Sequence, residues 1–194
     1  MNYLAHIYLS GEDDQLKIGN FIADSIKGRK FLHYPERIQK GIILHRAIDY
    51  YTDTHPVFRK SSQRLFPKYR HYSGVIVDIL YDHFLAANWK KYSSVPLETY
   101  VDQFYQMLNA HFDILPKKVQ RFLPVMIENN WLLNYATIEG IGKILYQMNM
   151  RTGNKSKMNF AVEDLQNHYE DFKKEFFEFF EDLRDFTQRK LPEL

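Results

Sequence analysis

Apolar side chains recur at helical spacing along almost the whole chain of 194 residues, and proline and glycine separate the repeating segments. The longest amphipathic segment, 157–190, places an apolar stripe opposite Glu, Asp, Lys and Arg. We expect this stripe to pack into the core rather than to bind a partner. No strand is expected, and no repeat or linker divides the chain. The pattern predicts an all-α protein in which residues 1–194 form a single-domain array of about eight or nine helices.

Helix boundaries are expected where prolines and glycines interrupt the apolar pattern. A helix over 14–27 should end at the glycine that follows it, because glycine adopts the left-handed conformation that often terminates a helix. A second helix should cover 35–53 and end before the next proline, since the residue preceding proline disfavours the α conformation. Pro67 should separate a short helix over 56–65 from a long helix over 70–90. Further helices are expected to begin near Pro96, Pro116 and Leu132.

Composition excludes several classes of protein. The chain is 45% hydrophobic and 16% aromatic, which is enough apolar mass for a packed core and too much for a disordered segment. A formal net charge of +2 gives no reason to expect a nucleic-acid partner. No apolar stretch is long enough for a membrane span, and the N-terminal segment lacks the pattern of a signal peptide. With no cysteine in the chain, we expect a cytoplasmic protein without a disulfide framework or a membrane partner.

The segment from Gly41 to Asp53 carries three polar residues at helical spacing. His45, Asp49 and Asp53 follow one another at i, i+4 and i+8, so they lie one above another on a single helix face. Apolar residues precede them on nearly the same face, and this predicts that the face points inward. Ionised carboxylates are costly in such a place unless they are paired or bound to a metal. The stripe therefore favours a bound cation, although Asp53 alone could cap the end of its helix.

Three other segments place polar residues among apolar neighbours. Asp78, Asp82 and His83 lie within the long helix, Asn20 and Asp24 are spaced i, i+4, and His6 lies between Leu4 and Ile7. Facing helices can bring such side chains together as metal ligands. A site of carboxylates with some imidazole favours Mn²⁺ or Mg²⁺, and a site richer in imidazole could take Fe or Zn²⁺. Bound divalent ions activate water and neutralise charge on a phosphoryl group, so the sequence predicts a phosphoesterase.

A structural interpretation of each polar group stands beside this prediction. One His–Asp pair at i, i+4 is more often a helix-stabilising pair than a metal site, and His6 alone would more often be a hydrogen-bonded core residue. If every cluster were of that kind, the protein would be a non-catalytic helical interaction module. The occurrence of four clusters in one chain favours the metal site.

The same residues carry a resemblance to a known family. MNYLAHIYLS, GNFIADSIKG, GIILHRAIDYYTDTHP and RHYSGVIVDILYDHFLAANW occur in this order and resemble acyl carrier protein phosphodiesterases. The resemblance implies an HD-phosphohydrolase-like helical fold and an enzyme that removes 4′-phosphopantetheine from holo-acyl carrier protein with Mn²⁺ or Mg²⁺. The adjacent His-Asp doublet of HD-type enzymes is absent, and only the reversed pair Asp82-His83 occurs. A nucleotide or another small phosphodiester is the alternative substrate.

The polar spacing and the resemblance together predict roles for individual residues. The expected metal ligands are Asp24, His45, Asp49, Asp78 and Asp82. The expected catalytic residues are His6, His83 and Arg46, with the histidines as further ligands or proton carriers and Arg46, or alternatively Arg70, on the phosphate. Acyl carrier proteins are acidic, so basic residues close to the motifs should bind the substrate. The candidates are Lys27, Arg29 and Arg70. The sequence does not predict an oligomeric state.

Overall fold

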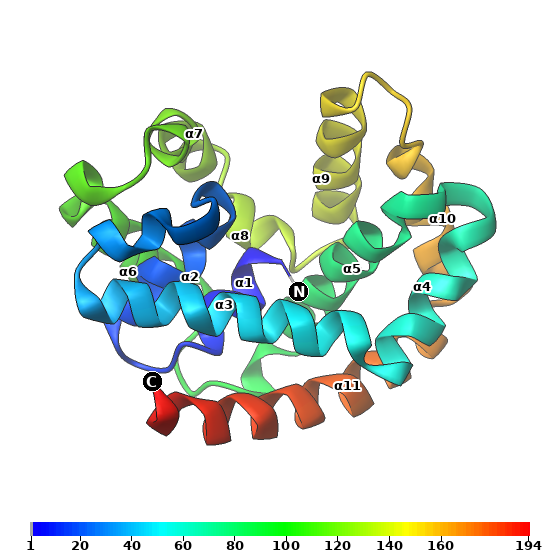
Figure 1. The fold of residues 1–194 in the computed structure, drawn as a ribbon. Helices are drawn as coiled ribbons and strands as arrows, with labels where there is room; N and C mark the ends of the chain where they lie inside the picture. Colours follow the sequence, from blue (N-terminus) through cyan, green and yellow to red (C-terminus); the bar gives the residue numbers. More distant parts are fainter. Residues whose placement is uncertain (1) are drawn as a thin grey trace.

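The computed structural model describes residues 2–194, and every regular element in this range is helical (Figure 1). The all-α prediction is confirmed. The described residues form eleven α-helices, which are α1 (Tyr3–Tyr8), α2 (Asp14–Ile22), α3 (Glu36–Thr54), α4 (Pro56–Tyr69), α5 (Ser73–Ala87), α6 (Leu97–Ala110), α7 (Lys117–Glu128), α8 (Trp131–Asn134), α9 (Ile138–Arg151), α10 (Ala161–Asn167) and α11 (Tyr169–Lys190). Short 3-10 helices connect several of them, including η1 (Ala23–Ser25), η2 (Gly28–His33) and η3 (Arg70–Tyr72).

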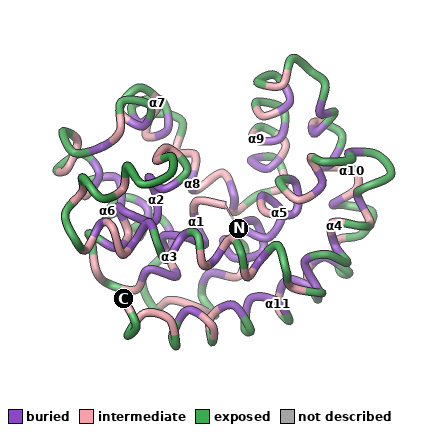
Figure 2. The backbone as a smooth tube through the Cα atoms, in the orientation of Figure 1, coloured by how far each residue is buried: buried purple, intermediate pink, exposed green. Residues whose placement is uncertain are grey.

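One hydrophobic core draws buried residues from each of these α-helices. Helix α11 runs along the base of the molecule below α3 in Figure 1, and its apolar stripe packs against α3, α4 and α5. Phe172, Phe176, Phe179 and Phe180 on this stripe are fully buried, so the predicted core role of the stripe is confirmed. Figure 2 shows that α1 and much of α5 are buried as well. Polar residues on these helices therefore need partners within the protein.

Two glycines let α2 and α3 approach each other closely. A Cβ atom on Gly19 would lie 2.2 Å from the carbonyl oxygen of Ile38, and one on Gly41 would lie 2.4 Å from the carbonyl oxygen of Leu16. Both distances are far below van der Waals contact, so any side chain at either position would push the helices apart. This contact places the end of α2, with Asn20, against the middle of α3, with His45.

Several helix boundaries differ from the sequence predictions. The helix expected over 14–27 ends at Ile22, and η1 follows, so Asp24 lies in a 3-10 turn instead of an α-helix. Pro67 does not separate two helices, because α4 continues through it to Tyr69. The chain turns instead at Arg70, whose φ of 51° cannot continue a right-handed helix.

The number of α-helices exceeds the expected eight or nine within residues 2–194. The segment 157–190 divides into a 3-10 turn, α10 and α11, because His168 leaves the helical conformation with φ −124° and ψ 29°. The short helices α1 and α8 account for the rest of the difference, since six and four residues are too few for a recognisable period. Within residues 2–194, no helix combines the length and the hydrophobicity that crossing a membrane requires.

Candidate active site

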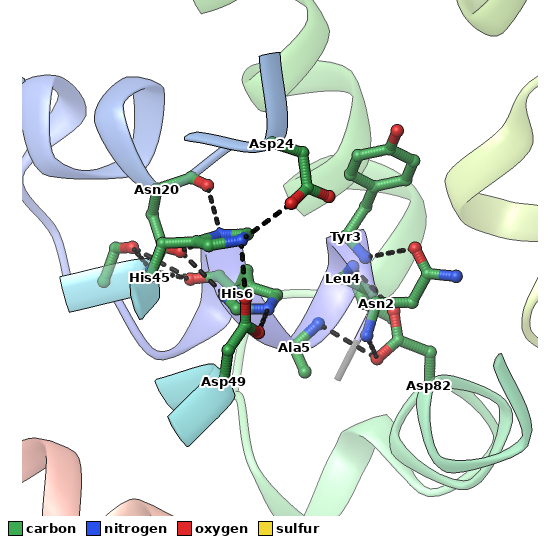
Figure 3. A network of polar contacts seen from close by, with 11 residues as sticks. Asn2, Tyr3, Leu4, Ala5, His6, Asn20, Asp24, His45, Asp49 and Asp82 are labelled. Carbon is green, nitrogen blue, oxygen red and sulfur yellow. Dashed lines mark hydrogen bonds and ion pairs between the residues drawn. The ribbon is translucent and has the colours of Figure 1, made fainter. Parts of the chain in front are cut away.

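The two histidines His6 and His45 face one carboxylate from adjoining helices. His6 lies on α1, and His45 and Asp49 lie one turn apart on α3 (Figure 3). The Nε2 atoms of His6 and His45 lie 3.2 Å from Asp49 Oδ1 and 3.0 Å from Asp49 Oδ2, respectively. The imidazole rings stack with centroids 4.0 Å apart and an angle of 19° between their planes. One ligand atom from each residue lies within 4.8 Å of the others, which is close enough for all three to hold one metal ion.

Asn20 orients both imidazole rings from behind. Its Oδ1 atom lies 2.7 Å from His6 Nδ1 and 3.1 Å from His45 Nδ1, and its main-chain oxygen lies 2.8 Å from His45 Nδ1. Because these are acceptor oxygens, each Nδ1 atom carries the proton and each Nε2 atom keeps its lone pair in the neutral ring. Metal-binding histidines use the same arrangement, in which a hydrogen bond on one nitrogen fixes the other for the metal.

A polar cavity of about 210 Å³ opens beside these residues. Asp24 from η1 reaches into it, with Oδ1 3.3 Å from His45 Nε2. Asp78 from α5 also lines the cavity, so α3, η1 and α5 each supply at least one carboxylate. The complete lining is Asp24, His45, Asp49, Thr52, Asp53 and Asp78. Such an oxygen-rich lining has the composition that Mg²⁺ and Mn²⁺ prefer.

The two histidines differ in their electrostatic environment. Burial disfavours a charge on His6, and neighbouring His45 adds to the effect, so the pKa of His6 falls to about 4. Burial acts in the same direction on His45, but hydrogen bonds to Asp24 and Asp49 outweigh it and raise its pKa to about 9. The hydrogen bond to His45 and the charge interactions with both imidazoles outweigh the burial of Asp49 and lower the pKa of that carboxyl group. At neutral pH the metal-free site therefore holds one imidazolium beside ionised carboxylates.

The polar atoms at the centre of this site fit a metal ion. His6 Nε2 is buried and forms no hydrogen bond of acceptable geometry, although Asp49 lies close to it. The hydroxyl oxygen of Thr52 in the cavity lining is also buried without a hydrogen bond. Leaving such atoms unpaired costs about 1–3 kcal/mol each. Two imidazole nitrogens and a carboxylate form a common ligand set for divalent transition metals, and an ion on them would use the lone pair of His6.

Asp82 and His83 make contacts of another kind. The carboxylate of Asp82 is fully buried and accepts hydrogen bonds from the backbone N–H groups of Asn2 at 3.2 Å, Leu4 at 2.8 Å and Ala5 at 3.4 Å (Figure 3). It thereby satisfies the free N–H groups at the start of α1. Burial raises the pKa of Asp82 to about 7. The structure thus places Asp82 where it anchors the helix that carries His6.

His83 points away from the cluster formed by His6, His45 and Asp49. Its Nδ1 atom lies 2.8 Å from the carbonyl oxygen of Tyr135, and its Nε2 atom lies 3.2 Å from the hydroxyl group of Tyr169. Burial lowers the pKa of His83. The predicted ligands Asp24, His45, Asp49 and Asp78 line one cavity, and the predicted catalytic residue His6 lies next to His45 and Asp49. Both ring nitrogens of His83 are engaged elsewhere.

The basic residues expected to bind the substrate occupy two regions. Lys27 and Arg29 lie at the exposed start of η2, a few residues after Asp24. Arg46 on α3 donates a hydrogen bond of 2.9 Å to the carbonyl oxygen of Gly28, and its guanidinium group lies 4.9 Å from the ring centre of Phe31. These contacts attach η2 to α3. Arg70 lies apart from this group, in the turn between α4 and α5 on the right of Figure 1.

Three residues that the structure places at the site were not among the expected metal ligands, catalytic residues or substrate-binding residues. Asn20 was noted for its spacing from Asp24, but its contacts with His6 and His45 arise only from the packing of α2 on α1 and α3. Asp53 belongs to the predicted stripe with His45 and Asp49, and it lines the cavity instead of only ending its helix. Thr52 had no signal, because a single threonine near a helix end is common in any helical protein.

Fold and site together define a class: an all-helical protein with a small carboxylate-rich cavity and a pair of buried histidines, of the kind that suits hydrolysis of phosphoesters. The model of the family described as "Acyl carrier protein phosphodiesterase" matches residues 1–183. The chain belongs to this family, as its sequence motifs predicted.

Curated relatives match the chain over nearly its full length. A protein named acyl carrier protein phosphodiesterase from Photorhabdus laumondii is 30% identical over 98% of this chain and 96% of its own length. Proteins of the same name from Pectobacterium atrosepticum and Yersinia enterocolitica are 29% and 28% identical, over 93% and 98% of this chain and 94% and 99% of their own lengths. No solved structure matches the chain.

Proposed function

We propose that this protein hydrolyses the phosphodiester that joins 4′-phosphopantetheine to a serine of holo-acyl carrier protein. The products are the apo-protein and free 4′-phosphopantetheine. Membership of the family supports holo-acyl carrier protein as the substrate. An enzyme that acts on this substrate would also share its compartment, which we propose to be the cytoplasm. The observation that carries the chemistry is the pair of buried imidazoles whose Nε2 atoms face Asp49 while Asn20 holds both Nδ1 atoms.

His6, His45 and Asp49 would hold a divalent ion, which we propose to be Mn²⁺ or Mg²⁺. When bound, such an ion activates water for attack on phosphorus and neutralises charge on the phosphoryl oxygens. Asp24 and Asp78 line the same cavity and would complete the ligand set or hold the attacking water. Water adds to phosphorus, the bond from phosphorus to the serine oxygen breaks, and that oxygen takes up a proton. The phosphate stays on the pantetheine.

The exposed start of η2 would bind the acidic substrate protein. Lys27 and Arg29 are exposed and follow Asp24, which lines the cavity, by a few positions in the chain, so we place them at the rim of the cavity. Charges of opposite sign at such a rim steer and orient a protein partner, with effects that weaken at high salt. Through its contacts with Gly28 and Phe31, Arg46 would keep this segment in place instead of contacting the phosphate.

A conversion assay tests the proposal. Metal-free protein is incubated with holo-acyl carrier protein and Mn²⁺, Mg²⁺, Fe²⁺ or Zn²⁺, and mass spectrometry measures the loss of 4′-phosphopantetheine. Mn²⁺ or Mg²⁺ should support conversion, and the variants His45→Ala and Asp49→Asn should abolish it. His71→Ala is the control, because His71 is an exposed histidine on η3 outside the cavity lining. Equal conversion by wild type and His45→Ala would reject the proposed site.

Two other outcomes would identify a different protein. Turnover of a small phosphodiester without any action on holo-acyl carrier protein would indicate an enzyme with a nucleotide or similar substrate. A melting temperature that does not change with any of the four ions would indicate a non-catalytic helical module, because a ligand that binds only the folded state must stabilise it.

A further inference from the structure

A second cavity of about 300 Å³ lies directly beside the cavity of the candidate active site. Asp24 and Asp78 line both cavities, so the two spaces share a wall. Figure 3 shows Asp24 between His45 on one side and Tyr3, which lines the second cavity, on the other. A ligand that reaches from one cavity into the other would therefore pass Asp24 and Asp78.

The lining of the second cavity combines apolar side chains with side chains that can form hydrogen bonds to amide groups. Trp131 from α8 and Ile144 and Met148 from α9 supply its apolar part. Side-chain amides of Asn2 and Gln147 supply groups that can donate and accept hydrogen bonds. Its size lies at the lower end of the range for small-molecule pockets. The lining suits a slender chain that carries alkyl groups and amides.

The indole of Trp131, one of three aromatic side chains that line this cavity, is already engaged within the protein. Trp131 stacks on Phe122 with ring centres 5.9 Å apart and 12° between the planes, and the guanidinium group of Arg151 lies 5.4 Å from its centre. Little of the indole remains for stacking against a nucleobase, which is how single bases are commonly held. Arg151 also contacts the sulfur of Met148 at 3.8 Å, and these contacts keep its charge at the cavity.

We propose that the second cavity binds the pantetheine arm of the substrate while the phosphodiester lies at His6, His45 and Asp49. This inference rests on the proposed function, because that reaction places the phosphate at the histidines. The pantetheine arm is bonded to this phosphate, so it must extend into a neighbouring space. The dimethyl group of the arm would pack against Ile144 and Met148. Its amides would pair with Asn2, Gln147 and Arg151.

A further cavity, away from the candidate active site, does not meet this requirement. It measures about 520 Å³ and lies between the segment around Tyr8 and the end of α11 around Arg184. None of its lining residues lines the cavity of the candidate active site. A ligand there would have no direct path to Asp49, so the second cavity is the one that fits an arm attached to the reacting phosphate.

Calorimetry with pantetheine, which has the arm but no phosphate, tests the inference directly. Met148→Trp should fill the second cavity and weaken binding at least about tenfold, which corresponds to 1.4 kcal/mol. Met150→Trp is the matched control, because Met150 lies on the same helix, is half exposed and lines neither cavity. Ile144→Trp is a second filling variant that serves if Met148→Trp does not fold. Failure of the wild type to bind pantetheine, or equal binding by the filled variant, would overturn the inference.

Asp49→Asn separates this inference from the proposed function. The variant should lose conversion of holo-acyl carrier protein but bind pantetheine as the wild type does, since Asp49 does not line the second cavity. If pantetheine binds and Met148→Trp blocks it while the wild type converts no holo-acyl carrier protein, the proposed reaction is wrong and the cavity assignment stands. If the wild type converts holo-acyl carrier protein and Met148→Trp converts it equally well, the cavity assignment is wrong and the proposed function stands.

Discussion

Replacing Asn20 by leucine should weaken metal binding without removing any proposed ligand. The change deletes the acceptor that holds Nδ1 of His6 at 2.7 Å, and His6 has no second partner for that atom. His45 keeps the main-chain oxygen of residue 20 at 2.8 Å. The carbonyl oxygen of His6 keeps a hydrogen bond from Ser10 at 2.8 Å. One buried N–H group is therefore left unpaired.

This count sets the size of the effect. One unpaired buried N–H group costs about 1–3 kcal/mol, which lowers the melting temperature of a chain of this length by roughly 2–12 °C. Loss of a residue that orients a metal ligand typically costs about 10–100-fold in metal affinity. We therefore expect Asn20→Leu to bind Mn²⁺ about 10–100-fold more weakly in a calorimetric titration, with a lower melting temperature.

Asn149→Leu is the control for this experiment. Asn149 is a buried asparagine on α9 that hydrogen-bonds to Asn154 at 2.8 Å and Ser156 at 3.0 Å, away from both histidines. It should lose stability but bind Mn²⁺ like the wild type. The reasoning is refuted if Asn20→Leu keeps wild-type affinity, or if Asn149→Leu weakens binding by as much.

Four further predictions follow from the structure. The raised pKa of His45, about 9 against an ordinary 6.5, stabilises the metal-free fold fully below pH 6.5, and this contribution should disappear as the pH rises through 9. Mn²⁺ must displace that proton, so its affinity should increase about tenfold per pH unit between pH 7 and 8 in calorimetry, and a flat profile would contradict the assignment. Asp82→Asn should lower the melting temperature by weakening the anchor of α1 yet leave all proposed ligands in place; complete loss of Mn²⁺ binding in a folded variant would instead make Asp82 a ligand. Charge reversal at Lys27 and Arg29 should raise KM for holo-acyl carrier protein at low salt without slowing turnover of a small phosphodiester, and an unchanged KM would exclude η2 as the docking segment.

Helical spacing was a reliable guide where the relevant contact lies within one helix. His45 and Asp49 are one turn apart, so their proximity follows from the helix alone, and the structure brings their side-chain atoms within 3.0 Å. The apolar stripe of α11 was predictable for the same reason. His6 and Asp24 join them through tertiary packing, which the sequence could indicate only through the presence of polar residues in apolar segments.

Asp82 shows that the same signal is ambiguous. An acid inside an apolar helix needs a partner, and the sequence does not distinguish a metal ion from the free N–H groups at the start of another helix. The pairing of Asp82 with α1 spans about 80 positions of the chain and has no local pattern. The bonds of His83 to Tyr135 and Tyr169 are equally distant in sequence. The end of α4 at Arg70 was not predicted, because the break was expected at a proline. Pro67 instead lies within α4.

Anomalous diffraction from crystals grown with Mn²⁺, measured at the manganese absorption edge, tests the central claim most directly. The account predicts a peak bonded to Nε2 of His6, Nε2 of His45 and a carboxylate oxygen of Asp49, and the peak should be absent from crystals of the Asp49→Asn variant. A peak bonded to surface carboxylates only, with the two imidazoles still facing Asp49 and no ion between them, would contradict it.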